Sequence, residues 1–288
     1  MEHLANALVQ GVMIGGLYSM FAVGLALIFG VMRLVNIAHG DLIVLSAYVA
    51  LVATQSLGLN PLAALVVVVP VMALVGYALQ RGLFNRTMGA DVMPALLVSF
   101  GLSVIIQNTL LMGFSADNKR LQAGSIEVAS VGLTDAISVG VLPLLQLVLA
   151  ILVIAGLQLL LYRTAIGRAL RAVSDDPRVS QLMGLNNKHV FGLAMALSCA
   201  IVALAGVLLA IRANFDPATG PTRLIFGFEA VIIGGLTNFW GTLVGGIFLG
   251  VVQSMASAID PGWQILAGHI AFLVVLALRP NGLFGGAS

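Results

Sequence analysis

Charge is scarce in this sequence. Asp, Glu, Lys and Arg make up 8% of its 288 residues, whereas a typical soluble domain carries roughly 25%. A chain this poor in charge cannot cover a folded surface with polar groups in water, but in a bilayer its outer surface faces lipid. The hydrophobic share of 60% and the mean hydropathy of +1.10 agree. The composition therefore indicates a membrane protein.

Several functional motifs are also absent. A single cysteine, Cys199, excludes an internal disulfide and a metal cluster held by thiolates. No G-x-x-x-x-G-K-[ST] phosphate loop occurs, because both lysines, Lys119 and Lys188, follow asparagine. The histidines lack the spacing of a metal site: His3, His39, His189 and His269. We therefore predict a chain that is not an enzyme, holds no cofactor or metal and, without a dense basic cluster, binds no nucleic acid.

What the sequence does contain is long uncharged runs, and a membrane-spanning helix needs about 20 mostly apolar residues. The second run is too long for one span, and Gly58-Leu59-Asn60-Pro61 divides it into a predicted helical hairpin. We therefore expect an all-α, polytopic transmembrane bundle with about eight hydrophobic segments, forming one domain over residues 1–288. The runs are Leu4–Met32, Leu42–Gln80, Val92–Ala116, Ala136–Tyr162, Val190–Ile211, Ala230–Ile259 and Pro261–Leu278.

The distribution of Lys and Arg predicts the topology. Met1-Glu2-His3 lacks the basic region of a secretory signal, so the first run is expected to remain as a membrane helix. An N-terminus outside and a C-terminus in the cytoplasm give the stronger excess of basic residues inside. The polar segment Ser115–Asp135 then forms an outer cap. In this topology Arg33, Arg81, Arg86, Arg163, Arg168, Arg171, Arg178, Lys188 and Arg279 lie inside, and Lys119, Arg120, Arg212 and Arg223 lie outside.

The seventh segment is expected to be broken or re-entrant. Glycines from Gly234-Gly235 to Gly241 divide it into a short and a longer half. Irregular backbone at membrane depth occurs only where protein or a water-filled cavity surrounds it, so we expect this segment to line the transport pathway. Gly234 and Gly235 serve either that pathway or close helix packing. Glu229 is either a carboxylate at a helix start, favoured by the helix dipole, or a pathway or gate residue.

Three polar residues, Asn36, His39 and Asp41, lie between the first two predicted helices. Ionisable groups near a membrane are costly unless paired or hydrated, which makes them candidates for the pathway or its gate. The simpler interpretation, which we favour for Asp41, is a polar turn at the cytoplasmic surface. There Arg33 would pair with Asp41, and Asn36 would cap the next helix.

The longest polar stretch on the inner side, residues 163–188, contains two short predicted helices. The first covers Ala165–Val173 and places Arg168 and Arg171 on one face. The second has an acidic cap at Asp175-Asp176, a proline at its first position and Gly184 after its end. Its apolar stripe packs either on its own bundle or into a groove of a cytoplasmic partner. The stripe consists of Val179, Leu182 and Met183.

This stretch carries a family resemblance. Gly167-Arg-Ala-Leu-Arg-Ala-Val-Ser-Asp-Asp-Pro177, followed by Met183-Gly-Leu-Asn186, resembles the cytoplasmic coupling loop of branched-chain amino-acid ABC permeases. Gly15-Gly-Leu-Tyr18 and Arg33-Leu-Val-Asn-Ile-Ala-His-Gly-Asp41 resemble the LivH-type member of that family. Glu229–Gly235 and Arg279-Pro-Asn-Gly-Leu-Phe284 fit the same pattern. The resemblance covers nearly the whole chain, in order.

The resemblance implies a permease subunit of an ATP-driven importer in the bacterial inner membrane. A second related permease, cytoplasmic ATPase subunits that use ATP, and an extracytoplasmic substrate-binding protein would be its partners. Val179, Leu182 and Met183 would be the buried contacts with the ATPase, and ATPase closure would drive alternating access. Charged residues would set register and partner choice: Arg168, Arg171, Asp175 and Asp176.

Three alternatives stay open on the sequence. A urea or amide permease of the same group would share these motifs, because the binding protein sets much of the specificity. An ion-coupled secondary transporter would use Asp41 or Glu229 as its coupling group and would transport without partners. A passive channel would need no energy source, but neither it nor the secondary transporter explains the capped coupling helix.

Overall fold

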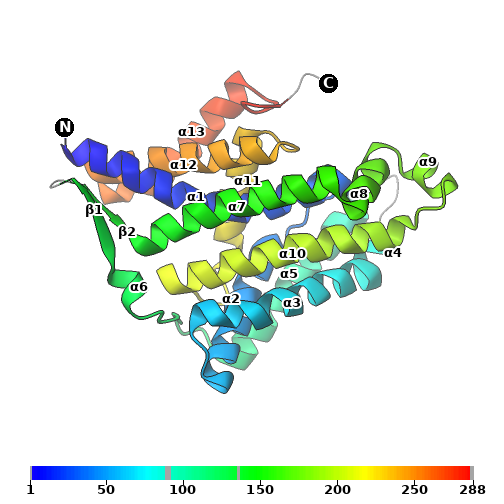
Figure 1. The fold of residues 1–288 in the computed structure, drawn as a ribbon, viewed down its shortest axis with the longest axis horizontal. Helices are drawn as coiled ribbons and strands as arrows, with labels where there is room; N and C mark the ends of the chain where they lie inside the picture. Colours follow the sequence, from blue (N-terminus) through cyan, green and yellow to red (C-terminus); the bar gives the residue numbers. More distant parts are fainter. Residues whose placement is uncertain (1, 88–91, 135–136, 286–288) are drawn as a thin grey trace.

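In the computed structural model, residues 2–87, 92–134 and 137–285 are described, and eight helices are long and apolar enough to cross a membrane. This matches the eight predicted segments. Figure 1 shows most of these helices lying roughly along one long axis. They are α1 (Glu2–Met32), α2 (His39–Leu57), α3 (Pro61–Leu79), α5 (Met93–Phe114), α7 (Val141–Arg163), α10 (Asn187–Arg212), α12 (Phe239–Ile259) and α13 (Gln264–Leu278).

Shorter elements complete the chain. A π-helix, η1 (Gln80–Phe84), and α4 (Asn85–Thr87) continue α3, and a 3₁₀ turn, η2 (Pro261–Trp263), leads into α13. Helices α8 (Ala165–Asp175) and α9 (Pro177–Leu182) follow α7, and α11 (Gly220–Gly234) precedes α12. The segment between α5 and α7 holds α6 (Ser125–Val128) and an antiparallel pair, β1 (Ser130–Thr134) and β2 (Ile137–Gly140). The all-helical prediction missed this strand pair.

Local signals place the predicted breaks. Gly58 ends α2 with φ of 64°, and the Asn60 side chain accepts the N–H of Leu62 to begin α3. The seventh segment is broken, as predicted, between α11 and α12. Gly235 has φ of 102°, which favours glycine, and Asn238 caps α12 through the N–H of Gly241. However, α11 begins at Gly220, well before the expected start.

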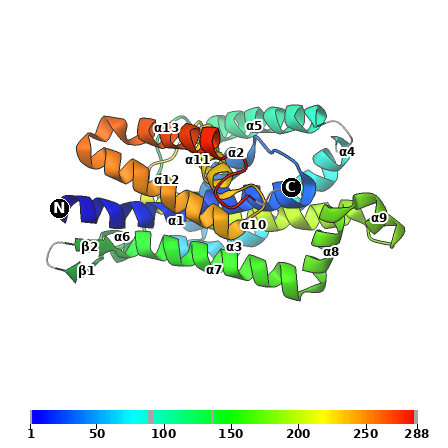
Figure 2. The ribbon, with the colours of Figure 1, turned by 90° about the horizontal axis from the view of Figure 1, so that it is seen from above.

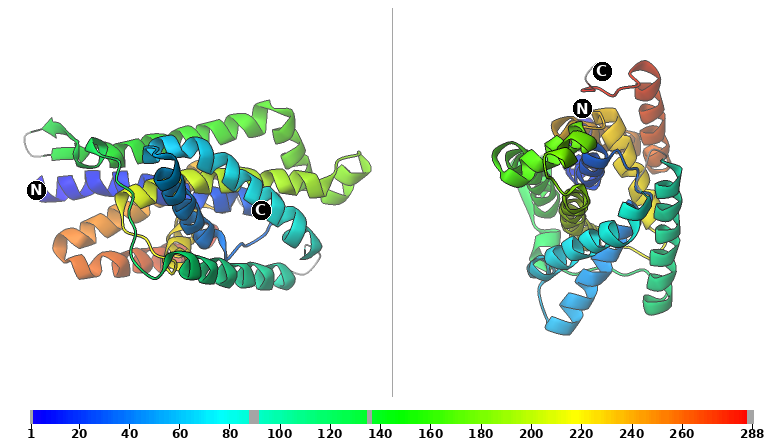
Figure 3. Two further views of the ribbon diagram at one scale, coloured as in Figure 1. Left: turned by 90° about the horizontal axis from the view of Figure 1, so that it is seen from below. Right: turned by 90° about the vertical axis from the view of Figure 1, so that its right-hand side faces the viewer.

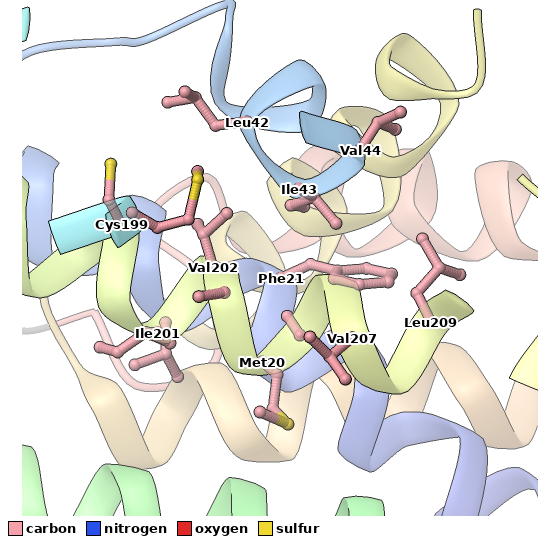
Figure 4. Packing of buried hydrophobic residues seen from close by; sticks show 14 of the residues in the cluster. Met20, Phe21, Leu42, Ile43, Val44, Cys199, Ile201, Val202, Val207 and Leu209 are labelled. Atoms are coloured by element: carbon pink, nitrogen blue, oxygen red, sulfur yellow. The ribbon is translucent and has the colours of Figure 1, made fainter. Parts of the chain in front are cut away.

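The two most buried spans, α1 and α10, form the centre of the bundle. They run in opposite directions, and the end-on view of Figure 3 shows the other helices around them. Their side chains meet those of α2 in one apolar cluster (Figure 4). Phe21 from α1, Ile43 from α2 and Val202 from α10 are fully buried there. This core fixes the amino-terminal part of α2 against both central helices.

The packing repeats in an inverted manner. Each central helix is followed by a loop and a helix that packs on the other central helix, since α2 contacts α10 and α11 contacts α1. In the same way α3 packs on α10 and α12 on α1, while α5 lies beside α2 and α13 beside α11. Such inverted repeats are common in transporters. The sequence echo Ile14-Gly-Gly-Leu17 and Ile233-Gly-Gly-Leu236 does not mark this repeat, because the first lies inside α1 and the second spans the end of α11.

Glycines bring α1 and α12 into backbone contact. A Cβ atom built on Gly15 would lie 2.4 Å from the Cα of Ile247, and one on Gly11 would lie 2.5 Å from the Cα of Val251. Conversely, a Cβ on Gly250 would meet the carbonyl oxygen of Gly11 at 2.4 Å. Small residues serve this role in membrane helices, where close backbone approach replaces a hydrophobic driving force.

We expect Gly15→Ala to separate α1 from α12. Alanine has a higher helix propensity than glycine. At this contact, however, the added methyl group would overpack the interface and should lower the free energy of unfolding by about 1–3 kcal/mol. Gly156→Ala is the matched control, because a Cβ at Gly156 in α7 would meet nothing within 4 Å. Thermal unfolding of the two variants in detergent checks the difference. Equal stability of both variants would contradict the proposed close contact.

Candidate functional site

The amino ends of α2 and α11 meet inside the bundle. A Cβ on Gly40 would lie 2.1 Å from the carbonyl oxygen of Gly220, and a Cβ on Gly220 would lie 2.1 Å from Oδ1 of Asp41. Glycine is therefore required on both sides of this contact. We call Gly40, Asp41 and Gly220 the half-helix junction.

The half-helix junction lies at mid-depth in the bundle. Nε2 of His39 donates to the carbonyl oxygen of Phe21 at 3.0 Å, and Phe21 lies eleven residues before Met32, the last residue of α1. At 1.5 Å per residue, Phe21 therefore lies about 16 Å from the carboxyl-terminal end of α1. Asn36, His39 and Asp41 are all buried. The predicted turn at the cytoplasmic surface is therefore wrong: the chain returns into the bundle before α2 begins.

The polar groups of this turn are only partly paired. Oδ1 of Asp41 accepts from Nε2 of Gln107 on α5 at 3.0 Å, and Oδ1 of Asn36 accepts the N–H of Ala38 at 3.1 Å. The expected ion pair between Arg33 and Asp41 is absent from the described residues. The predicted cap is wrong as well: α2 has no side-chain cap, and Asn36 bonds only the N–H of Ala38, the residue before the helix. Three buried atoms of this turn have no partner within the described residues: Nδ2 of Asn36, Nδ1 of His39 and Oδ2 of Asp41.

Glu229 belongs to a second polar cluster. It is the tenth residue of α11, so its interpretation as a carboxylate at a helix start is wrong. Its Oε1 accepts from Nδ1 of His269 on α13. The Phe226 ring stacks on His269 with a centroid distance of 6.3 Å and contacts the ring of Tyr18 at 5.1 Å. The Tyr18 hydroxyl donates to Gln253 at 2.6 Å. The carboxylate is buried, whereas 38% of the His269 side chain is exposed.

Gly234 and Gly235 have clear packing roles. A Cβ on Gly234 would lie 2.2 Å from the carbonyl oxygen of Gly241, and one on Gly235 would lie 2.9 Å from the N–H nitrogen of Gly285. The final segment also donates from Leu283 to the carbonyl oxygen of Ile233 at 2.8 Å. These contacts close the break between α11 and α12 with protein atoms.

Three further polar residues of the bundle lie on α5, α11 and α13. Figure 2 shows α5 and α13 along one edge of the bundle and α7 along the opposite edge. Sequence reasoning missed three of the polar residues because they lie within helices without a motif. They are Gln107 on α5, His269 on α13 and Arg223, which was expected in an outer loop but lies on α11. Only the break after Gly234 signalled that this region is irregular.

The helix pair α8–α9 follows its local signals. The Thr164 side chain caps α8, and the Asp176 carboxylate accepts from Arg178 and Val179 to begin α9. The N–H groups of Val179 and Arg178 hold the pKa of Asp176 below its ordinary value. Gly184 has φ of 86° and ends the turn after α9. Asp175, next to this cap, makes no ion pair within the described residues.

The apolar stripe of α9 faces away from the bundle. Val179, Leu182 and Met183 are 54%, 87% and 80% exposed, and Figure 1 shows α9 at the far end of the molecule. The alternative in which this stripe packs on its own bundle is therefore wrong. Of the two predicted arginines, Arg171 stacks over Tyr162 at 4.7 Å, and Arg168 makes no ion pair within the described ranges.

Comparison with known proteins identifies the family. Residues 7–278 match the model of the branched-chain amino acid transport system permease component. The chain belongs to this permease family. It is 27% identical to the high-affinity branched-chain amino acid permease BraD of Pseudomonas aeruginosa, over 98% of this chain and 96% of that protein. No solved structure matches it significantly.

Other relatives widen the range of named substrates. A probable branched-chain amino acid permease, LivH of Methanocaldococcus jannaschii, is 29% identical over 92% of this chain and 88% of its own length. The fructose import permease FrcC of Rhizobium meliloti is also 29% identical, over 85% of this chain and 69% of its own length. The chain is thus similar to permeases named for branched-chain amino acids and to one named for fructose. No group of residues that could hold a metal occurs in the described parts of the chain.

We expect Gly220→Ala to open the half-helix junction, because its methyl group would overlap the Asp41 carboxylate. Overpacking of this kind costs about 1–3 kcal/mol, and the strain should appear locally. Hydrogen exchange read by mass spectrometry should therefore accelerate in peptides covering the first turns of α2 and α11. Gly113→Ala, where a Cβ would meet nothing within 4 Å, is the control. Unchanged exchange in both helices would contradict the packing described here.

Proposed function

We propose that this chain is a membrane-spanning permease subunit of an ATP-binding-cassette importer for branched-chain or related small amino acids. Similarity to the named amino-acid permeases extends over nearly the full length of both chains. The sugar permease matches less of its own length, which favours an amino acid over a sugar as the substrate. Urea or a short amide is the alternative within the group.

The observation that carries the energy source is the exposed stripe on α9. A capped helix of six residues is too short to be stable alone, yet it presents three large apolar side chains to solvent at the end of the molecule. Such a surface is favourable only when a partner covers it. We assign that partner to a cytoplasmic ATPase subunit, which supplies the ATP chemistry that this chain lacks. An ion-coupled secondary transporter would leave the stripe uncovered.

The second permease is proposed to cover the side bearing α5 and α13. These helices expose apolar side chains such as Phe100 and Leu273. Helix α5 also carries polar side chains, namely the exposed Asn108 and the partly exposed Gln107. Polar groups facing lipid at this depth are costly. A water-filled pathway between two permeases would hydrate these polar groups. The buried residues Asn36, His39, Asp41 and Glu229 would then lie next to that pathway.

The N-terminus is proposed to lie outside and α8–α9 in the cytoplasm of a bacterial cell, across the inner membrane. The excess of basic residues around α8 and α9 supports this orientation. The strand pair and α6 then form the outer surface to which a substrate-binding protein would deliver its ligand. A bond from Gln10 to the carbonyl oxygen of Ser138 at 3.0 Å holds β2 to α1.

Leu182→Asp should uncouple ATP hydrolysis from transport. The substitution places a charge in the middle of the proposed ATPase contact, where desolvation of an unpaired carboxylate is costly. We expect uptake by the reconstituted complex to fall roughly tenfold or more, the size of a lost 1.4 kcal/mol or greater, while the permease remains in the membrane. Gln181→Asp adds the same charge to an exposed neighbour off the stripe and should retain uptake. Unchanged uptake by Leu182→Asp would contradict the docking assignment.

Purification of the tagged chain from its native membrane in mild detergent tests the whole assignment. A stoichiometric ATPase and a second permease should co-purify, and the complex should import labelled leucine with ATP and its binding protein. Transport by the isolated chain would instead favour a secondary transporter or a channel. Import of urea or an amide but not leucine would replace the substrate and keep the mechanism.

A further inference from the structure

Arg223, inside the bundle, forms no ion pair with any residue that the structure describes. Arg223 lies on α11, one turn beyond the half-helix junction, and is half-buried. Its Nε is shielded from solvent and has no hydrogen-bond partner, and Arg223 forms no ion pair within the described residues. Asp216 lies within electrostatic range but beyond ion-pair distance. The other partly buried arginine of this region, Arg212, does have a partner, since it donates to Oε1 of Gln146 at 2.8 Å.

The surroundings of Arg223 exclude lipid as its normal environment. Its neighbours Pro221, Thr222 and Ile225 are exposed, so the first half of α11 presents an open face. A charged and a hydroxyl side chain on that face would be costly against acyl chains. The end-on view of Figure 3 shows α11 between α5 and α13 on the proposed pathway side. This face therefore belongs to the pathway.

A carboxylate of opposite sign lies further along the same helix. The Tyr18 hydroxyl is within electrostatic range of both Arg223 and Glu229. Oε2 of Glu229 has no partner, although its Oε1 is bonded to His269. A zwitterion passing along α11 would thus meet a free cation first and a half-satisfied carboxylate a few residues later. Between the two charges lies the aromatic surface of Phe226 and Tyr18.

We propose that Arg223 binds the carboxylate of the amino acid during its passage, with Glu229 and His269 contacting the ammonium end. The guanidinium fork suits a carboxylate because it offers two parallel donors. This inference rests on the proposed function, since it names the chemical group of the substrate that the pathway recognises. It makes Arg223 a residue that selects α-amino acids over uncharged solutes and sugars.

Charge rescue tests the role of Arg223. In the assembled importer, Arg223→Cys should lower leucine uptake roughly tenfold or more, the loss expected for a charge-assisted hydrogen bond. Treatment with 2-aminoethyl methanethiosulfonate restores a cation at this position and should restore uptake. The neutral methyl adduct should not. The single native thiol, Cys199, is buried, so the wild-type complex treated with each reagent is the control.

Three outcomes would overturn the inference: full uptake by the untreated Arg223→Cys complex, rescue by the neutral adduct, or rescue by neither adduct. If the variant does not assemble, the wild-type complex decides instead. Phenylglyoxal labelling of Arg223, mapped by mass spectrometry, should slow when saturating leucine is transported, and an unchanged labelling rate would refute the contact. Leucine import by the wild-type complex is measured in parallel. Its absence would refute the proposed function itself, whereas its presence with an insensitive Arg223 would refute only this inference.

Discussion

Every backbone polar group at membrane depth must find a partner within the protein, and the rest of this fold depends on that constraint. Two of the places where the chain leaves helical geometry inside the bundle are before α2 and after α11. In the first break Ile37 donates to the Ser99 hydroxyl, and Ala38 donates to Asn36. In the second, Leu283 from the final segment donates to Ile233. Both breaks therefore need a surrounding layer of helices before they can exist.

That layer determines where function can lie. Enclosing two breaks requires α1 and α10 to be central, with glycines allowing α12 and α11 to approach them closely. Several polar groups near the breaks are left without full pairing. Asp41, Arg223 and Glu229 are each incompletely paired there. Unpaired polar atoms are destabilising in a folded chain, which is why these three residues are the ones assigned to the proposed pathway.

The sequence predicted those features that local chemistry decides. Run lengths identified the eight spans, Gly58 to Pro61 identified the hairpin, and Asp176, Pro177 and Gly184 identified α9, because caps and helix breakers act within a few residues. It failed where distant contacts decide. The sequence alone suggests a surface position for His39, because it does not show that the carbonyl oxygen of Phe21 accepts a hydrogen bond from its ring. It suggests a loop position for Arg223, because it does not show that α11 begins at Gly220. The interior position of α2 depends on packing against α10, which no local pattern encodes.

A series of helix contacts connects α9 with the half-helix junction, beginning with the contact between α9 and α8. Helix α8 packs against α1, α7 and α10, and the Ser174 hydroxyl donates to the carbonyl oxygen of Gly30 near the inner end of α1 at 2.5 Å. Helix α1 carries Phe21, whose carbonyl oxygen accepts from His39, and α10 runs from the loop that holds α8 and α9 to the position where it packs against α2. Closely packed helices move as units rather than deforming. Helix α8 therefore touches both helices that support the half-helix junction, which is the arrangement that the proposed coupling to an ATPase requires.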